Sequence, residues 1–264
     1  MKEKQKIKKV IEQLNIIDDT VFEKMAEDIG FCEETISTIL ERKVKVLKVI
    51  SQNSIKNLQG RSVVLDALCE FTNGERCNVE VQKENDDDHQ RRVRYNTSCI
   101  TANITDPGTK FENVPTVYGI FISKFDIFKE NKTVYHVDRI VRGSGTVLDN
   151  GLYEIYVNTK IDDGSDIAQL MKIYKEQNTY DFERFPNVSK RKKQFLKSEE
   201  VQGNMVDVVR EYAKEYAKER ELDTAKNLLK NGVSYEIIVK SMKNITPEEL
   251  KVVLDECNKE IGLK

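Results

Sequence analysis

The chain has 264 residues, of which 39% are apolar and 33% are charged. This length exceeds that of a typical single domain, so we expect one large core with an appendage or two small domains. The low apolar share excludes a bundle of membrane-spanning helices. Because 43 basic residues stand against 45 acidic ones, the net charge is only −2, and nucleic acid would have to bind at a local basic patch.

Five cysteines without a CxxC pair indicate reduced, mostly buried thiols, as in a cytosolic protein. The N-terminal stretch has no apolar segment typical of a signal peptide, and no segment approaches the ~18 apolar residues of a membrane span. We therefore expect a cytoplasmic protein without a membrane partner.

Hydrophobic periodicity predicts alternating helices and strands over most of the chain. A Gly143-Ser144-Gly145 triplet is typical of a hairpin turn. In chain order, the predicted elements are helices over 18–42, strands at 44–50, 62–71 and 76–83, a helix over 89–103, strands at 116–123, 133–141 and 152–158, and a helix over 165–177.

The pattern weakens after about residue 178, where Pro186 and a basic cluster at 190–193 occur. We expect a first domain over 1–180, a basic linker over 181–205 and a helical C-terminal extension over 206–264. A Thr246-Pro247-Glu248-Glu249 capping box is expected to open the last helix. The extension could serve in docking or in forming a homo-oligomer.

Motifs of common enzyme classes are mostly missing. The sequence contains no GxxxxGK[ST], HExxH or GxSxG segment and only two histidines, so P-loop, histidine-metal and serine-hydrolase chemistry are poorly supported. Two acids on the predicted hairpin remain, Asp66 and Glu80. Two carboxylates on one open sheet face offer hard oxygen ligands at a fixed separation, as a divalent cation requires.

The loop of this hairpin decides whether the two acids meet. A two-residue Asn73-Gly74 turn would place Asp66 and Glu80 on opposite faces, whereas a three-residue loop with a left-handed Gly74 places them opposite each other on one face. Because a one-residue slip exchanges the faces, the hydrophobic pattern discriminates between the registers. The bulged register makes one face wholly apolar, and we favour it; that face contains Val63, Leu65, Ala67, Cys69, Phe71, Cys77, Val79 and Val81.

Asp66, followed by Glu80-x-Gln82 and a helix with Arg92, resembles the PD-(D/E)xK nuclease superfamily. Within it, the chain is similar to the Rpn branch, a family of recombination-promoting nucleases and transposases. The resemblance covers roughly residues 15 to 200. The segments that carry it are GRSVVLDALC (60–69), CNVEVQ (77–82), HQRRVRYN (89–96) and the later PTVYGIFISKFDIF and GLYEIYVNT runs.

The resemblance implies an α/β fold, a restriction-endonuclease-like mixed sheet flanked by helices, that cuts DNA with Mg²⁺ or, as an alternative ion, Mn²⁺. It makes Asp66 and Glu80 metal ligands, with the Val81 carbonyl as a third. Gln82 stands where the family usually has lysine. A neutral amide can orient an attacking water but cannot accept its proton.

The resemblance leaves two further questions to the structure. An N-terminal helix sometimes adds a carboxylate in this family, and both Glu34 and Glu41 are candidates. The helix from residue 89 would contact phosphate. Its candidate phosphate ligands are His89, Arg91, Arg92 and Tyr95, although the arginines could instead pair with the preceding aspartates and Tyr95 could serve in packing.

The resulting hypothesis is a metal-dependent DNA endonuclease of mobile-element or recombination-promoting type. One alternative is a catalytically silent DNA-binding or assembly protein that keeps the nuclease fold. Another is a metal-dependent hydrolase that acts on a different substrate.

Overall fold

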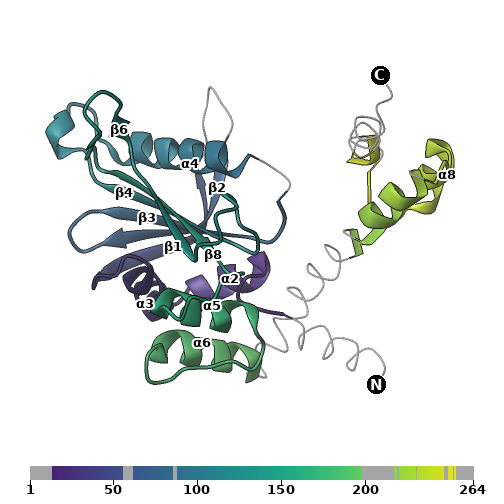
Figure 1. Cartoon of the computed structure of the whole chain (residues 1–264), viewed down its shortest axis with the longest axis horizontal. Helices are drawn as coiled ribbons and strands as arrows, with labels where there is room; N and C mark the ends of the chain where they lie inside the picture. The colour runs from purple at the N-terminus through teal and green to yellow at the C-terminus, as the bar shows by residue number, and fades with distance from the viewer. Residues whose placement is uncertain are drawn as a thin grey trace. The chain divides into compact units, whose positions relative to one another are not determined.

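The computed structural model describes residues 14–55, 62–85 and 88–197, together with residues 217–218, 220–229, 231–246, 249–251 and 253 of the C-terminal part. The chain divides into two compact units (Figure 1). One unit spans Ile11–Val201, and the other combines Met1–Val10 with Gln202–Lys264. In the described part of the chain, no helix has the length and apolar character needed to cross a membrane.

A six-stranded mixed sheet forms the centre of the larger unit, with the strand order β1-β2-β3-β4-β8-β5. The first three strands are antiparallel, β3, β4 and β8 are parallel, and β5 pairs antiparallel with β8. This confirms the predicted fold class. The strands are β1 (Val46–Ile55), β2 (Val63–Phe71), β3 (Arg76–Gln82), β4 (Val117–Ser123), β5 (Val134–Val137) and β8 (Leu152–Asn158).

Helices cover both faces of this sheet (Figure 1). One face carries α4, and the other carries α2 and α3, against which α5 and α6 pack. Capping side chains set two of the starts, since Asp88 accepts the Arg91 N–H at α4 and Ser165 accepts the Ala168 N–H at α5. The helices are α2 (Asp19–Ala26), α3 (Ile29–Ile39), α4 (His89–Ile104), the 3₁₀ turn η1 (Phe111–Asn113), α5 (Asp166–Lys175) and α6 (Pro186–Lys197).

Several predicted elements differ from the structure in their ends. The helical stretch 18–42 is two helices, because the Asp28 side chain accepts the Phe31 N–H and starts α3. The strand predicted at 133–141 is divided into β5 and a short β6 (Ile140–Val141), which pairs with β7 (Thr146–Val147). The Gly143-Ser144-Gly145 turn joins β6 to β7, as predicted.

The range 181–205, which we expected to be a basic linker, contains α6, and α6 packs against α3. The basic cluster is not uniformly exposed either. Lys192 is buried, and its ammonium donates to the carbonyl oxygens of Ile173 at 2.7 Å, of Glu176 and of Thr179. These carbonyls lie at the end of α5 and just after it, so Lys192 joins α6 to the end of α5.

The core lies between the sheet and the helices α2, α3, α5 and α6. The face predicted to be apolar is buried along its whole length, as the alternation requires. Cys32, Cys69 and Cys77 are free thiols in this core, whereas Cys257 lies outside the described residues.

The C-terminal unit contains helical residues over 220–229, α8 (Tyr235–Ser241) and helical residues 249–251 and 253. Ala225, Ile238 and Leu250 form its buried centre. The predicted capping box is present, because Thr246 Oγ1 accepts the Glu249 N–H and Glu249 accepts the Thr246 N–H.

Candidate active site

The β2–β3 hairpin has the register that the hydrophobic pattern favours. Gly74 has a φ of 87°, a left-handed conformation that suits glycine, and its N–H donates to the Phe71 carbonyl. The ladder pairs Cys69 with Cys77 and Ala67 with Val79. One further step of this register places Asp66 opposite Glu80, as predicted for the three-residue bulged loop.

Asp66 is partly buried at this position, and its Oδ2 accepts the Val81 N–H at 3.1 Å. Burial first, and then the negative charges of Glu80 and Asp19, raise the pKa of its carboxyl to about 8. The Val81 N–H and the positive charge of Arg92 act in the other direction. Asp66 therefore lacks enough positive charge around it to ionise readily.

Glu80 is 1% exposed, which contradicts the expectation of a face open to solvent. Helix α4 covers this face, and its Asn96 donates from Nδ2 to Glu80 Oε1 at 2.5 Å. Asn78 Nδ2 donates to the same oxygen at 2.8 Å. Arg92 Nε lies 3.4 Å from the other oxygen, Oε2.

Gln82 continues the same face of β3 and is also contacted from α4. Its Oε1 accepts a hydrogen bond from Arg92 Nη1 at 3.1 Å. The neighbouring Lys83 belongs to a different contact, because its Nζ lies 2.7 Å from Asp18 Oδ1. Arg92 is therefore the cation that connects the two predicted catalytic residues of β3.

The close approach of α4 depends on Gly119 in β4. A Cβ atom at this position would lie 2.8 Å from Thr97 Cγ2 and 3.2 Å from Val93 Cγ1, both on α4. These separations are shorter than ordinary van der Waals contact. Glycine at 119 thus allows α4 to lie low enough for Asn96 to reach Glu80.

The four predicted phosphate ligands of α4 have different environments. Arg92 lies in the site, whereas the side chain of Arg91 is 78% exposed and forms an ion pair with Asp88 at 3.2 Å. His89 is buried, with its ring between those of Phe121 and Phe125 at centroid distances of 5.2 and 5.1 Å. Tyr95 is half-buried against an apolar cluster. The structure therefore brings only Arg92 into contact with Glu80 and Gln82.

Neither predicted N-terminal candidate, Glu34 or Glu41, lies beside Asp66 and Glu80. Glu34 accepts the N–H groups of Asn187 and Val188, at 3.2 and 2.7 Å, at the start of α6. Asp19, at the start of α2, is the residue whose charge acts on Asp66. No motif or spacing in the sequence marks Asp19 as part of the site.

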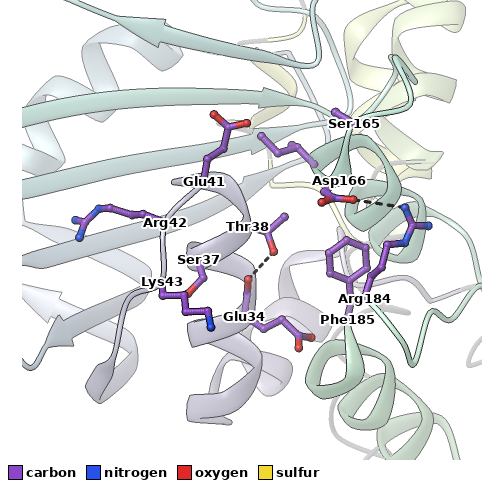
Figure 2. Close-up of a pocket in the computed structure, with 11 residues that line it drawn as sticks. Glu34, Ser37, Thr38, Glu41, Arg42, Lys43, Ser165, Asp166, Arg184 and Phe185 are labelled. Atoms are coloured by element: carbon purple, nitrogen blue, oxygen red, sulfur yellow. Dashed lines mark hydrogen bonds and ion pairs between the residues drawn. The ribbon is translucent and has the colours of Figure 1, made fainter.

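Glu34 and Glu41 instead line a pocket of about 600 Å³ beside α3 (Figure 2). Its lining also includes residues at the start of α5 and just before α6, among them the ion pair of Arg184 with Asp166. Asp66, Glu80 and Gln82 do not line this pocket. The acids that we expect to act together therefore lie on β2 and β3 and not in this pocket.

The donor set suits a hard cation held in part by water and substrate. Within the described residues, no group of three or more His, Cys, Asp or Glu side chains could hold a metal alone. The Asp66–Glu80 pair supplies two carboxylates whose charges repel each other. Glu80 Oε2 and Asn78 Oδ1 are buried acceptors to which no described residue donates a hydrogen bond. Residues with unsatisfied oxygen acceptors and excess negative charge fit Mg²⁺ or Mn²⁺.

A mixed sheet with helices on both faces and paired acids on neighbouring strands defines a restriction-endonuclease-like α/β protein. The sequence model of the family described as PD-(D/E)XK nuclease family transposase matches residues 28–228, which is most of the chain. The chain therefore belongs to this family. No curated protein and no solved structure matches it significantly.

Proposed function

We propose that this protein is a metal-dependent endonuclease that hydrolyses DNA phosphodiester bonds, in the cytoplasm and in the service of recombination or mobile-element movement. The observation that carries the proposal is the hairpin register, which sets Asp66 opposite Glu80. Membership of a nuclease family supports the same chemistry.

In this proposal Asp66 and Glu80 hold Mg²⁺, or Mn²⁺ as the alternative ion, with the Val81 carbonyl as a third ligand. Such an ion acidifies bound water and stabilises the charge that develops on phosphate. Gln82 orients the attacking water through its amide, and because an amide is not a base, the proton leaves to solvent or to phosphate.

The phosphate contacts in this proposal come from Arg91 and Arg92 of α4. Arg92 is placed between Glu80 and Gln82, and the exposed Arg91 provides a further charge on the outer side of the helix. His89, which we also predicted as a phosphate ligand, is enclosed by aromatic rings, and Tyr95 packs on apolar side chains, so we assign the phosphate contacts to Arg91 and Arg92.

Nicking of supercoiled plasmid in the presence of Mg²⁺ tests the proposal. We expect Asp66→Asn to lower the nicking rate by at least about 100-fold, because it removes one of two charged ligands. Glu70→Gln is the matched control, since Glu70 lies on the same face of β2 but forms a surface ion pair with Arg76 at 3.2 Å. Equal nicking by wild type and Asp66→Asn would refute the assignment.

One observation favours a catalytically silent DNA-binding or assembly protein as the second candidate. Gln82 replaces the usual lysine, and Arg92, a cation that contacts it, is bound to Glu80 and to Gln82 itself. This candidate predicts DNA binding that weakens steeply with salt while the plasmid stays intact.

A further inference from the structure

The two carboxylate oxygens of Glu80 have different surroundings. Oε1 accepts hydrogen bonds from two buried amides, Asn78 Nδ2 at 2.8 Å and Asn96 Nδ2 at 2.5 Å. Oε2 is buried and receives no hydrogen bond from the described residues. Two donors from different elements fix the rotation of the carboxylate, so Oε2 is the oxygen left for a cation.

Arg92 is the cation that lies nearest to Oε2, with Nε at 3.4 Å, and it is held there loosely. This contact is an ion pair without hydrogen-bond geometry. The guanidinium makes a better contact with Gln82, because its Nη1 donates a hydrogen bond to Gln82 Oε1 at 3.1 Å. The side chain of Arg92 is 34% exposed, whereas that of Glu80 is 2% exposed. Arg92 can therefore move toward solvent, and Glu80 cannot.

Asn78 adds a second unsatisfied acceptor beside Glu80. Asn78 Oδ1 is a second buried acceptor without a hydrogen-bond donor among the described residues, and it belongs to the amide that holds Glu80. Buried acceptors of this kind are unfavourable unless a donor or a cation reaches them. Arg92 offsets this deficit only in part, because it contacts a single oxygen of Glu80.

We propose that Arg92 is an internal counter-ion that competes with the divalent cation for Oε2 of Glu80, and that it moves to a DNA phosphate when the cation binds. This inference rests on the proposed function. A divalent cation at Oε2 would lie close to the Arg92 guanidinium and repel it, so cation binding and the Arg92–Glu80 contact weaken each other. The released guanidinium can then bind phosphate through two N–H groups.

Calorimetric titration of the full-length protein with Mn²⁺ alone tests the competition. We expect Arg92→Gln to bind Mn²⁺ about 3- to 10-fold more tightly than wild type, because the competing charge is gone. The same variant should bind duplex DNA more weakly. Arg94→Gln is the matched control, since Arg94 is exposed on the same helix, and its Mn²⁺ affinity should equal that of wild type.

Arg92→Lys provides a second variant in case Arg92→Gln does not fold. It keeps the charge but has a single ammonium that cannot contact Glu80 and Gln82 together, so its Mn²⁺ affinity should lie between those of wild type and Arg92→Gln. If Arg92→Gln leaves the Mn²⁺ affinity unchanged or weakens it, the inference is overturned. The proposed function still stands in that case, provided that wild type nicks plasmid and Asp66→Asn does not. Absence of Mn²⁺ binding by every variant and by wild type would overturn both the inference and the metal-dependent function.

Discussion

Asp66 and Lys192 are ionisable side chains that the fold surrounds with protein, and their partners differ. Burial lowers the pKa of Lys192 to about 8, yet its ammonium finds three carbonyl acceptors for its three N–H groups. Among the described residues, Asp66 accepts one hydrogen bond, from the Val81 N–H, and the negative charge of Glu80 acts on it. The carbonyls of the fold thus stabilise the charged form of Lys192, whereas the surroundings of Asp66 favour its protonated form.

The raised pKa of Asp66 predicts a dependence of stability on pH. Between its unfolded value near 4 and its folded value of about 8, the folded state binds more protons, so Asp66 makes the protein less stable as pH rises through this window. We expect Asp66→Asn to be more stable than wild type by about 2–4 kcal/mol above pH 8 without metal, and to match it near pH 4.

Urea unfolding at pH 4 to 9 in a chelator measures this difference. Glu70→Gln, which removes only a surface ion pair, should differ from wild type by less than about 1 kcal/mol. A gap between Asp66→Asn and wild type that does not grow with pH would contradict the burial and the charge repulsion that raise the pKa of Asp66.

At the scale of single residues, sequence analysis found the acids of the hairpin but missed their surroundings. Period-two alternation places Asp66 and Glu80 on one face without any knowledge of the rest of the fold. Asn78 and Asn96 carried no signal, because an asparagine gains its role only from the carboxylate that folding brings to it. Asp19 was missed for the same reason.

At the scale of elements, the separation of α4 from the sheet decides whether the site exists. We expect Gly119→Ala to lower the free energy of unfolding by about 1–3 kcal/mol, because its Cβ would press on Thr97 and Val93. Lifting α4 should also break the Asn96–Glu80 hydrogen bond and lower the nicking rate.

Gly143→Ala is the control for this prediction, because a Cβ at Gly143 would meet no atom within 4 Å. Thermal unfolding of the two variants gives the comparison. Equal stability of both would mean that α4 shifts without cost, and the assigned role of Gly119 would then be wrong.

Element boundaries show what periodicity can and cannot predict. The hairpin, α4 and β8 lie close to their predicted ranges, since caps, turns and alternation mark their ends locally. The 181–205 range was read as a linker because its charge pattern is typical of exposed chain. This range contains α6, which buries Lys192. The burial depends on carbonyl groups in α5 and in the segment after α5, 13 and 19 residues earlier in the chain, which a local charge pattern does not reveal.

At the scale of the whole molecule, the division into two units predicts a separable domain. All proposed catalytic residues and the six-stranded sheet lie in Ile11–Val201. We expect a fragment of residues 11–201 to fold by itself, with a melting temperature within about 5 °C of the same transition in the full chain.

Circular dichroism during heating measures this transition, and Mn²⁺ titration of the fragment shows whether the site is retained. A fragment that is unfolded at 25 °C would mean that the C-terminal unit contributes to the core. The full-length chain measured beside it provides the reference transition.

The amino-acid sequence by itself determined the strand faces, the turn at Gly74 and therefore the meeting of Asp66 with Glu80, because side-chain alternation and glycine's access to positive φ are local properties. Only the tertiary structure decided what lies above those acids. Helix α4 closes the face, and its Asn96 joins Asn78 of β3 in donating to one oxygen of Glu80, while the other oxygen is left to Arg92. How closely α4 lies on the sheet is set by helix-on-sheet packing at positions such as Gly119 of β4, and no repeating pattern in the sequence encodes that shape.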